Sequence, residues 1–235
     1  MPKKEFVRAM FDNISGSYDK LNHLMSADVD KSWRRKAIRK IAEGFPGGEK
    51  MKLLDLACGT GDFSIAAARM IPSAEVTGLD LSSGMLEVMK TKVQAASLGD
   101  RISMVTGDGE NLPFPDGTFD RVSIAFGIRN FENREQGLRE MLRVLKPGGR
   151  LVVLELSVPE NPAVRSLYKL YFTKVMPAVG GIISGDSKAY KYLPASVLNF
   201  PTKDEFLATM RSCGFRDASH RALTLGICRM YWGVK

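Results

Sequence analysis

The sequence predicts an α/β fold: a Rossmann-like, seven-stranded, mostly parallel sheet with helices on both faces. Two observations lead to this prediction. Between residues 51 and 156, apolar strand-like runs alternate with helix-like runs, which is typical of parallel strands joined by crossover helices. Residues 215–235 then read as a hairpin that completes the sheet. The chain has 235 residues, 44% of them hydrophobic, which suits one domain with a full core.

The strand-like runs are short and apolar, and turn residues follow them. They span residues 51–57, 75–81, 101–108, 119–126 and 150–156. The helix-like runs span residues 62–71, 85–93 and 134–145. Thr202 to Glu205 has the pattern of a capping box and predicts a further helix up to Cys213, which Gly214 ends.

Two segments lie outside this alternation. Residues 1–45 are basic and helix-like, which predicts an N-terminal helical cap that ends in the glycine-rich residues 44–48. Residues 159–200 are interrupted by prolines and glycines but contain an amphipathic stretch at 164–176. We expect a helical lid over the substrate in residues 159–200, within a single domain spanning residues 1–235.

The residues after the first two strands suit a nucleoside ligand. Parallel sheets bind ligands beyond the carboxyl ends of their strands. Gly59, Thr60 and Gly61 follow the first strand, where glycines let a ligand approach the backbone at a helix N-terminus. Asp80 ends the second strand, 19 residues after Gly61, where a carboxylate can accept from both hydroxyls of a ribose.

The third strand leads into a similar position. Asp108 can accept the amino group of adenine, and the N–H of Gly109 can bind a ring nitrogen. NAD, FAD and S-adenosylmethionine (SAM) all contain adenosine. Ser64 stands where the dinucleotide fingerprint has its third glycine, and this disfavours an oxidoreductase, as does the absence of a Tyr-x-x-x-Lys pair.

Three charged or polar residues stand in unusually apolar surroundings. Asp55 lies inside the first strand, where an unpaired carboxylate would cost several kcal/mol. We therefore expect a partner for Asp55 on the ligand or on a nearby backbone N–H. Arg129 and Asn130 follow the fourth strand in the run IAFGIRNFEN. They belong either to a solvated loop or to a ligand site.

The composition limits the partners. The net charge of +8 suggests nucleic acid, an anionic membrane or an anionic ligand. An NPPY-like tetrad or a Pro-Cys nucleophile, expected in nucleic-acid methyltransferases, is absent, so we expect no nucleic acid. The cysteines and histidines cannot form a zinc site at the usual spacings, so we expect no metal. They are Cys58, Cys213, Cys228, His23 and His220. Without a signal-like or membrane-spanning run, the expected location is the cytoplasm.

The motifs DLACGTGDFS, VTGLDLS, GDGENLPFPDGTFDRV and LRVLKPGGRLVVLE resemble those of class I SAM-dependent methyltransferases. The segments FDNISGSYDKLNHLMS, AFGIRNFEN and KAYKYLPASV are more specific. They resemble the C-methyltransferase family of menaquinone and ubiquinone biosynthesis, over nearly the whole chain from Phe6. The resemblance implies SAM as the cofactor. Its methionine end would lie at Gly59, Thr60 and Gly61.

The resemblance also implies the other contacts of SAM. The ribose would contact Asp80, and the adenine would contact Asp108 and Gly109. Some family members have a serine where this chain has Ala125. A hydroxyl contact to the cofactor would therefore be missing here, or supplied by the backbone. A non-catalytic protein with the same fold is disfavoured because the glycine and acid positions are intact.

The resemblance implies C-methylation of demethylmenaquinol to menaquinol. Alternatives are the ubiquinone precursor 2-polyprenyl-6-methoxy-1,4-benzoquinol and a small-molecule O- or N-methyltransferase. We hypothesise that Arg129 stabilises the phenolate and holds a proton-accepting water, and that Asn130 donates to the same oxygen. Tyr18 would close over both ligands. The competing interpretations are an ion pair of Arg129 with Glu132 or Glu135, and core packing of Tyr18.

A polyprenyl quinol lives in a bilayer, so we expect peripheral contact with the inner face of the cell membrane, and a homodimer is a further expectation. The stretch 164–176 and the apolar loop 179–183 could cover the polyprenyl tail, and the basic stripe 31–40 could rest on anionic lipid. The alternatives are an ordinary core stripe and a solvated basic face.

Overall fold

The computed structural model describes residues 3–16, 18–19, 28–171 and 187–235. The predicted apolar loop 179–183, the end of the stretch 164–176, and His23 lie outside the described residues. Within the described residues, no helix is long and apolar enough to cross a membrane.

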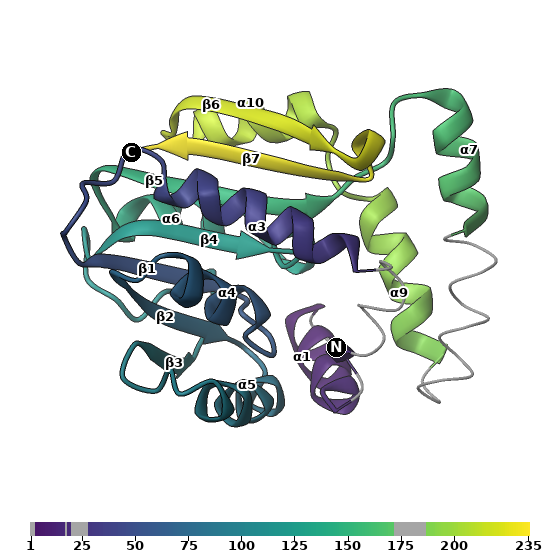
Figure 1. Ribbon diagram of the computed structural model, residues 1–235. Helices are drawn as coiled ribbons and strands as arrows, with labels where there is room; N and C mark the ends of the chain where they lie inside the picture. The colour runs from purple at the N-terminus through teal and green to yellow at the C-terminus, as the bar shows by residue number, and fades with distance from the viewer. Residues whose placement is uncertain (1–2, 17, 20–27, 172–186) are drawn as a thin grey trace.

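The described chain alternates strands and helices in the predicted order (Figure 1). The strands are β1 (Met51–Leu56), β2 (Ala74–Asp80), β3 (Ile102–Thr106), β4 (Phe119–Ala125), β5 (Leu145–Leu156), β6 (Arg216–Leu223) and β7 (Cys228–Val234). The α-helices are α1 (Lys3–Ile14), α3 (Val29–Ala42), α4 (Asp62–Met70), α5 (Ser83–Ala95), α6 (Arg134–Val144), α7 (Pro162–Leu170), α9 (Ser187–Leu198) and α10 (Lys203–Ser212). Two short 3-10 helices are η1 (Ile128–Asn130) and η3 (Thr224–Gly226).

The seven strands form one sheet in the order β3-β2-β1-β4-β5-β7-β6. The first five are parallel, and β7 runs antiparallel to both β5 and β6. The prediction of a mostly parallel sheet completed by a hairpin is therefore confirmed. The strand order reverses between β1 and β4, and a crevice at such a switch point is where open α/β sheets bind ligands.

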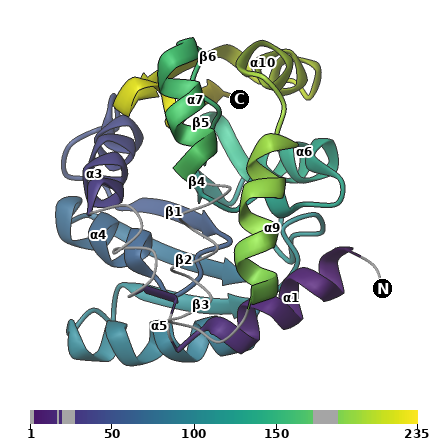
Figure 2. The ribbon, with the colours of Figure 1, turned by 90° about the vertical axis from the view of Figure 1, so that its right-hand side faces the viewer.

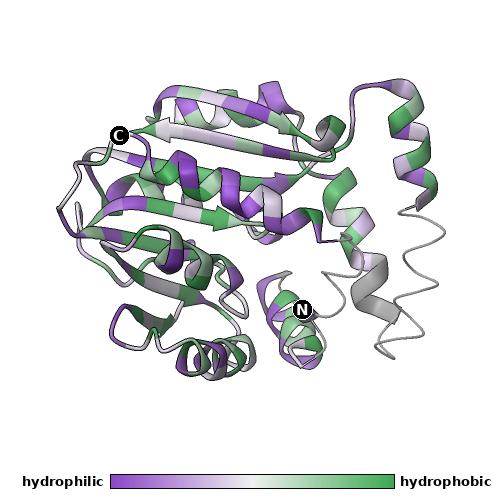
Figure 3. Cartoon of the chain, viewed as in Figure 1, coloured by the Kyte–Doolittle hydropathy of each residue, from purple (hydrophilic) through white to green (hydrophobic). Residues whose placement is uncertain are grey.

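Helices cover both faces of the sheet (Figure 2). One face packs against α3, α4 and α5 through residues such as Ile38, Ala67 and Met89, all fully buried. The other face packs against α6 and α10 through Met141 and Met210. Because both faces are covered, the central strands are mainly apolar, with a few polar residues among them, as the hydropathy colours indicate (Figure 3).

Helices α1, α7 and α9 lie at the edge of the sheet toward which β1 and β4 point (Figure 1). Asn161 caps α7 and Pro162 starts it, which is where proline favours a helix. The predicted capping box of Thr202 and Glu205 is confirmed at the start of α10. Pro194, one of the prolines of residues 159–200, lies inside α9.

Candidate active site

Two adjoining cavities open at the carboxyl ends of the central strands. The larger has a volume of about 330 Å³ and the smaller about 100 Å³. Five residues line both cavities: Tyr18, Ala57, Gly59, Ala125 and Phe126. Ala57 and Phe126 adopt left-handed backbone conformations, with φ of 50° and 61°. Such strain is rare outside glycine and gathers at functional sites.

Asp80 lines the smaller cavity at the end of β2. One of its carboxylate oxygens accepts the N–H of Gly59 at 2.8 Å, and the other accepts the N–H of Ser82 at 2.9 Å. Burial raises the pKa of Asp80, although these hydrogen bonds lower it. Each carboxylate oxygen has two lone pairs. Asp80 can therefore accept two ribose hydroxyls as well as the two backbone donors.

Asp108 and Gly109 line the same cavity, as predicted for an adenine site. A Cβ at Gly109 would lie 2.6 Å from Cζ of Phe131, so only glycine fits beside this ring. Asp108 accepts the N–H of Glu110 at 3.0 Å and forms an ion pair with Lys4 from α1. The sequence did not indicate Lys4, which competes with the adenine amino group for this carboxylate.

The turn after β1 separates the two cavities. Gly61 has φ of 84°, and a Cβ there would lie 2.5 Å from Cγ of Met89. Thr60 is buried, and its hydroxyl donates to a carboxylate oxygen of Asp19. The prediction that Gly59, Thr60 and Gly61 contact a ligand stays a prediction. The geometry supports contacts from the backbone of these residues, since the Thr60 hydroxyl already donates to Asp19.

Asp55 is buried in β1, and its partners differ from those we expected. Its carboxylate accepts the hydroxyl of Ser64 at 2.6 Å and that of Ser123 at 2.9 Å. Two side-chain hydroxyls thus take the place of the expected backbone donor, whereas the expected partner on a ligand stays a prediction, since Asp55 also lines the larger cavity. Burial raises the pKa of Asp55 to about 6, and the two hydroxyl donors limit the rise. Ser64, which stands where the dinucleotide fingerprint has a glycine, thus provides one of the two hydrogen bonds to the buried carboxylate of Asp55.

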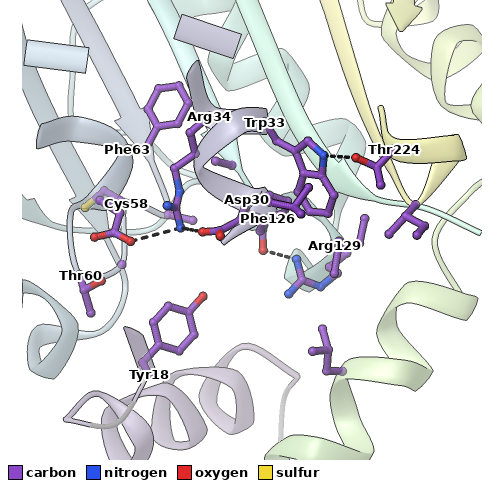
Figure 4. A pocket seen from close by; sticks show the side chains of 18 of the residues that line it. Tyr18, Asp30, Trp33, Arg34, Cys58, Thr60, Phe63, Phe126, Arg129 and Thr224 are labelled. Atoms are coloured by element: carbon purple, nitrogen blue, oxygen red, sulfur yellow. Dashed lines mark hydrogen bonds and ion pairs between the residues drawn. The ribbon is translucent and has the colours of Figure 1, made fainter. Parts of the chain in front are cut away.

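The larger cavity has mainly apolar and aromatic walls (Figure 4). Trp33 from α3 and Phe126 lie with ring centroids 6.2 Å apart, and the Trp33 indole donates to the Thr224 hydroxyl at 2.8 Å. Tyr168 from α7 and Leu193 from α9 line the same space. A cavity with these walls suits an aromatic ring that carries an apolar substituent.

Arg129 lines this cavity and is buried, so the interpretation as a solvated loop residue is wrong. Its guanidinium donates to Glu155 at 2.8 Å and to the carbonyl of Phe126, and its backbone N–H donates to Glu155 at 3.2 Å. Our alternative partners were wrong. Glu132 accepts from the backbone of Lys4, and Glu135 pairs with Arg139.

Sequence reasoning missed Glu155, which is fully buried near the end of β5. The signal was present, because Glu155 is the single acid in the apolar run LVVLEL. An acid in such a run needs a buried partner. The sequence alone did not show that Arg129 would be that partner.

Asn130 lines the smaller cavity, and Tyr18 lines both cavities. The Tyr192 hydroxyl donates to the amide oxygen of Asn130 at 3.1 Å, so the amide nitrogen is the end that can donate to a ligand. Tyr18 lines both cavities and packs edge-on against Phe11, with ring centroids 5.9 Å apart. Its position serves both interpretations, closure over ligands and packing of the N-terminal segment.

The chain is a class I SAM-dependent methyltransferase, with SAM as its methyl donor, as its family match shows, and the sheet topology and the two adjoining cavities fit this class. The chain belongs to the ubiE/COQ5 methyltransferase family, whose profile matches residues 1–235. It is 49% identical over 234 residues to the ubiquinone/menaquinone biosynthesis C-methyltransferase UbiE of Geotalea daltonii, covering 99% of this chain and 97% of that relative. It is 45% identical to the demethylmenaquinone methyltransferase of Porphyromonas gingivalis, covering 100% and 94%.

Solved structures agree on the fold. The [4+2]-cyclase SpnF aligns with a TM-score of 0.66 at 22% identity, covering 93% of this chain and 76% of that one. Phosphoethanolamine N-methyltransferase 2 of Haemonchus contortus aligns with a TM-score of 0.64 at 16% identity, covering 86% and 52%. Since the first is named as a cyclase, this fold alone does not fix the reaction.

Proposed function

We propose that this chain transfers the methyl group of SAM to a ring carbon of demethylmenaquinol, giving menaquinol. The observation that carries the proposal is the pair of adjoining cavities. One is lined by acids at strand ends that suit adenosine, and the other is apolar and contains Arg129. The names of the relatives from Geotalea daltonii and Porphyromonas gingivalis support a quinol acceptor. The benzoquinol precursor of ubiquinone is the second candidate, because the first of these names includes ubiquinone.

The acceptor must lose a phenolic proton before its ortho carbon can attack the methyl group. A phenol has a pKa near 10, so ionising it at pH 7 costs about 4 kcal/mol. A donor preorganised in a dry site contributes roughly 3–4 kcal/mol to stabilising such an oxyanion. SAM would supply the electrophilic methyl group on a positively charged sulfur, which leaves as a neutral thioether. The hydrogen on the methylated ring carbon is then lost as a proton and the phenolate oxygen regains one, which restores the aromatic quinol.

We assign the stabilising role to Arg129. Its guanidinium is buried at the apolar end of the larger cavity, where low dielectric strengthens its hydrogen bonds. Arginine keeps its proton at any accessible pH, so it acts as a donor and holds the water that removes the phenolic proton. The Asn130 amide donates to the same oxygen from the side of the smaller cavity, which it lines, and Tyr18, which lines both cavities, closes over both ligands.

Glu155 modifies this assignment. Its carboxylate neutralises the charge of Arg129, which weakens the field at the phenolate compared with an unpaired arginine. In return, the hydrogen bond from the guanidinium to Glu155 orients the side chain of Arg129, and the bond from its backbone N–H to the same carboxylate fixes the backbone there. Preorganised donors of this kind act without reorganising during the reaction.

We also propose that the protein contacts a membrane surface beside the larger cavity. Leu167 and Leu170 on α7 and Leu225 in η3 are 69%, 56% and 75% exposed. Their neighbours Tyr168 and Thr224 line the larger cavity, so these leucines border the space where a polyprenyl tail would leave it. Within the described part of the stripe, Leu167 is exposed whereas Tyr168 is buried in a core cluster, so the core interpretation does not hold for Leu167.

The basic stripe 31–40 is less suited to lipid than expected. Arg34 is turned inward to Asp30 and Asp62, and Lys40 pairs with Glu43. Arg35, Lys36 and Arg39 stay exposed. We therefore place the main contact at the leucines of α7 and η3. A homodimer stays a prediction, tested by light scattering on the purified chain.

An anaerobic assay tests the reaction, using methyl-labelled SAM in detergent with either reduced demethylmenaquinone or the reduced ubiquinone precursor. Label in menaquinol alone is the expected result. Label in both quinols would mean one enzyme for two pathways. Label in neither, with SAM still bound, would remove the roles assigned to Arg129 and Asn130. The same assay with a panel of phenols and amines then tests the alternative, because label in these compounds would indicate a small-molecule O- or N-methyltransferase.

A further inference from the structure

One end of the larger cavity is charged, unlike the aromatic end near Arg129 (Figure 4). Arg34 of α3 reaches into it, and one of its guanidinium nitrogens lies 2.7 Å from Asp30 and 3.2 Å from Asp62. The Arg34 and Asp30 side chains are only 12% and 6% exposed. All three residues line the cavity together with Gly59 and Thr60, where the methionine end of the donor is expected.

The rotation of α3 explains why Arg34 points inward. Trp33, Ala37 and Ile41 recur at helical spacing and are buried against the sheet. Arg34 lies beside this apolar face and one turn after Asp30, whereas Arg35 points to solvent. Adjacent arginines of the same basic run thus have different surroundings, which makes Arg35 a matched control for Arg34.

In the ion pairs around Arg34, the described carboxylates outnumber the cations, which favours a cationic ligand. Lys92 of α5 pairs with Asp62 at 2.5 Å and with Asp19 at 2.7 Å. Within the described residues, these ion pairs and that of Arg34 with Asp30 join three carboxylates and two cations, which gives this set one net negative charge. SAM carries an ammonium, a carboxylate and a sulfonium, and therefore one net positive charge.

We propose that Arg34 and Asp30 form a clamp for the zwitterionic amino-acid end of the methyl donor. Arg34 donates to the α-carboxylate, and Asp30 accepts from the α-ammonium. The ion pair within the protein is then replaced by two pairs across the interface, so no buried charge loses its partner. This inference rests on SAM as the donor and does not depend on the identity of the acceptor.

The competing interpretation is a structural one, in which Arg34 only ties α3 to the start of α4 through Asp62. The two interpretations differ in what they require of the ligand. A clamp distinguishes ligands with and without an amino-acid end, whereas a structural tie affects every ligand of the neighbouring turn equally.

Isothermal titration of the full chain tests the clamp with two probes. S-adenosylhomocysteine has the amino-acid end, and 5′-methylthioadenosine lacks it. We expect Arg34→Gln to weaken S-adenosylhomocysteine about tenfold or more, which is 1.4 kcal/mol or more. It should leave 5′-methylthioadenosine unchanged. Arg35→Gln should leave both affinities unchanged. Equal weakening of both ligands by Arg34→Gln, or no weakening, would overturn the clamp.

The unaltered chain provides a second test that needs no folded variant. It should bind S-adenosylhomocysteine at least about tenfold more tightly than decarboxylated S-adenosylhomocysteine, and equal affinities overturn the proposal. If none of these nucleosides binds, the donor assignment and the clamp are both overturned. A failed quinol assay with intact binding would affect only the proposed acceptor.

Discussion

The two cavities differ in how the chain builds them. The smaller is formed mainly by the segments that follow β1 to β4, where Asp80 accepts backbone N–H groups, and it is covered by residues of α1. The larger combines side chains that are far apart in sequence, from Tyr18 to Ile227. The donor site thus depends mainly on local turns at strand ends. The acceptor site depends on how distant helices pack, so a family can vary its acceptor while keeping its donor.

The largest expected effect is at Arg129 in the acceptor cavity. Arg129→Gln alone would leave Glu155 buried and unpaired, which costs about 3–5 kcal/mol of stability. The double variant Arg129→Gln, Glu155→Gln avoids this charge. We expect it to fold, to bind S-adenosylhomocysteine as the unaltered chain does, and to lose about 100- to 1000-fold in kcat. Single-turnover rates with saturating SAM measure the loss.

The Glu155→Gln single variant is the matched control for Arg129. It keeps the guanidinium but removes the carboxylate that orients and neutralises it. If Glu155 mainly orients Arg129, kcat falls. If it mainly dampens the positive charge, the pH profile of kcat shifts to lower pH, because the phenol then ionises more easily. Full turnover by the double variant would contradict the acceptor site as described.

The next effect is at Asp80 in the donor cavity. Asp80→Asn removes the negative charge that is expected to accept both ribose hydroxyls, and hydrogen bonds to charged groups contribute about 1.5–3 kcal/mol each. We expect the affinity for S-adenosylhomocysteine to fall about 100-fold in isothermal titration. Unlike Arg34→Gln, this change should weaken 5′-methylthioadenosine equally, since both ligands contain the ribose. A loss below about threefold would contradict the ribose role.

The difference between the cavities also explains what the sequence could predict. Asp80 and Gly109 were predicted because parallel strands end at one edge of the sheet, so residues after consecutive strands meet there. The partners of Asp55 were not, because Ser123 faces it only through the register of β1 with β4. Strand register is a tertiary property that the order of residues in one strand does not contain.

Glu155 and Arg34 were missed for related reasons. Glu155 meets Arg129 because β5 pairs with β4 and the backbone turns into η1 directly after β4. Arg34 was grouped with Arg35 in the basic stripe 31–40, which we expected to rest on anionic lipid or to be a solvated face, because a run of basic residues does not reveal which of them faces inward. Helix periodicity gives the apolar face, but residues at its border can point to a cavity or to solvent.

Asp55 lies in β1, just before the turn of Gly59 to Gly61, and should make the stability of the chain depend on pH. Its pKa rises from 3.8 to about 6 on folding because of burial. Between these values the folded state keeps a proton that the unfolded state has released, so the free energy of unfolding falls as pH rises from 4 to 6. The expected contribution is about 2 kcal/mol. It is measured as the difference between the unaltered chain and Asp55→Asn in urea unfolding at several pH values.

Ser123→Ala is the matched variant for this effect. Loss of one hydroxyl donor leaves burial less opposed, so the pKa of Asp55 should rise further and the pH dependence should extend above pH 6. A difference between the unaltered chain and Asp55→Asn that stays flat from pH 4 to pH 6 would contradict the shifted pKa. In that case the carboxyl of Asp55 would titrate as a solvated group does, in spite of its burial.

The smallest expected effect is at the membrane side of the acceptor cavity. Leu225→Ser removes an exposed apolar side chain next to the cavity lining, and we expect about a threefold loss of binding to vesicles, neutral or anionic. Met70→Ser, at an exposed apolar residue of α4, should change nothing. Arg35→Gln should lower binding only to anionic vesicles. If Arg35→Gln lowers binding and Leu225→Ser does not, the contact runs through the basic stripe. The tail would then have to leave the cavity past α3 instead of past α7 and η3.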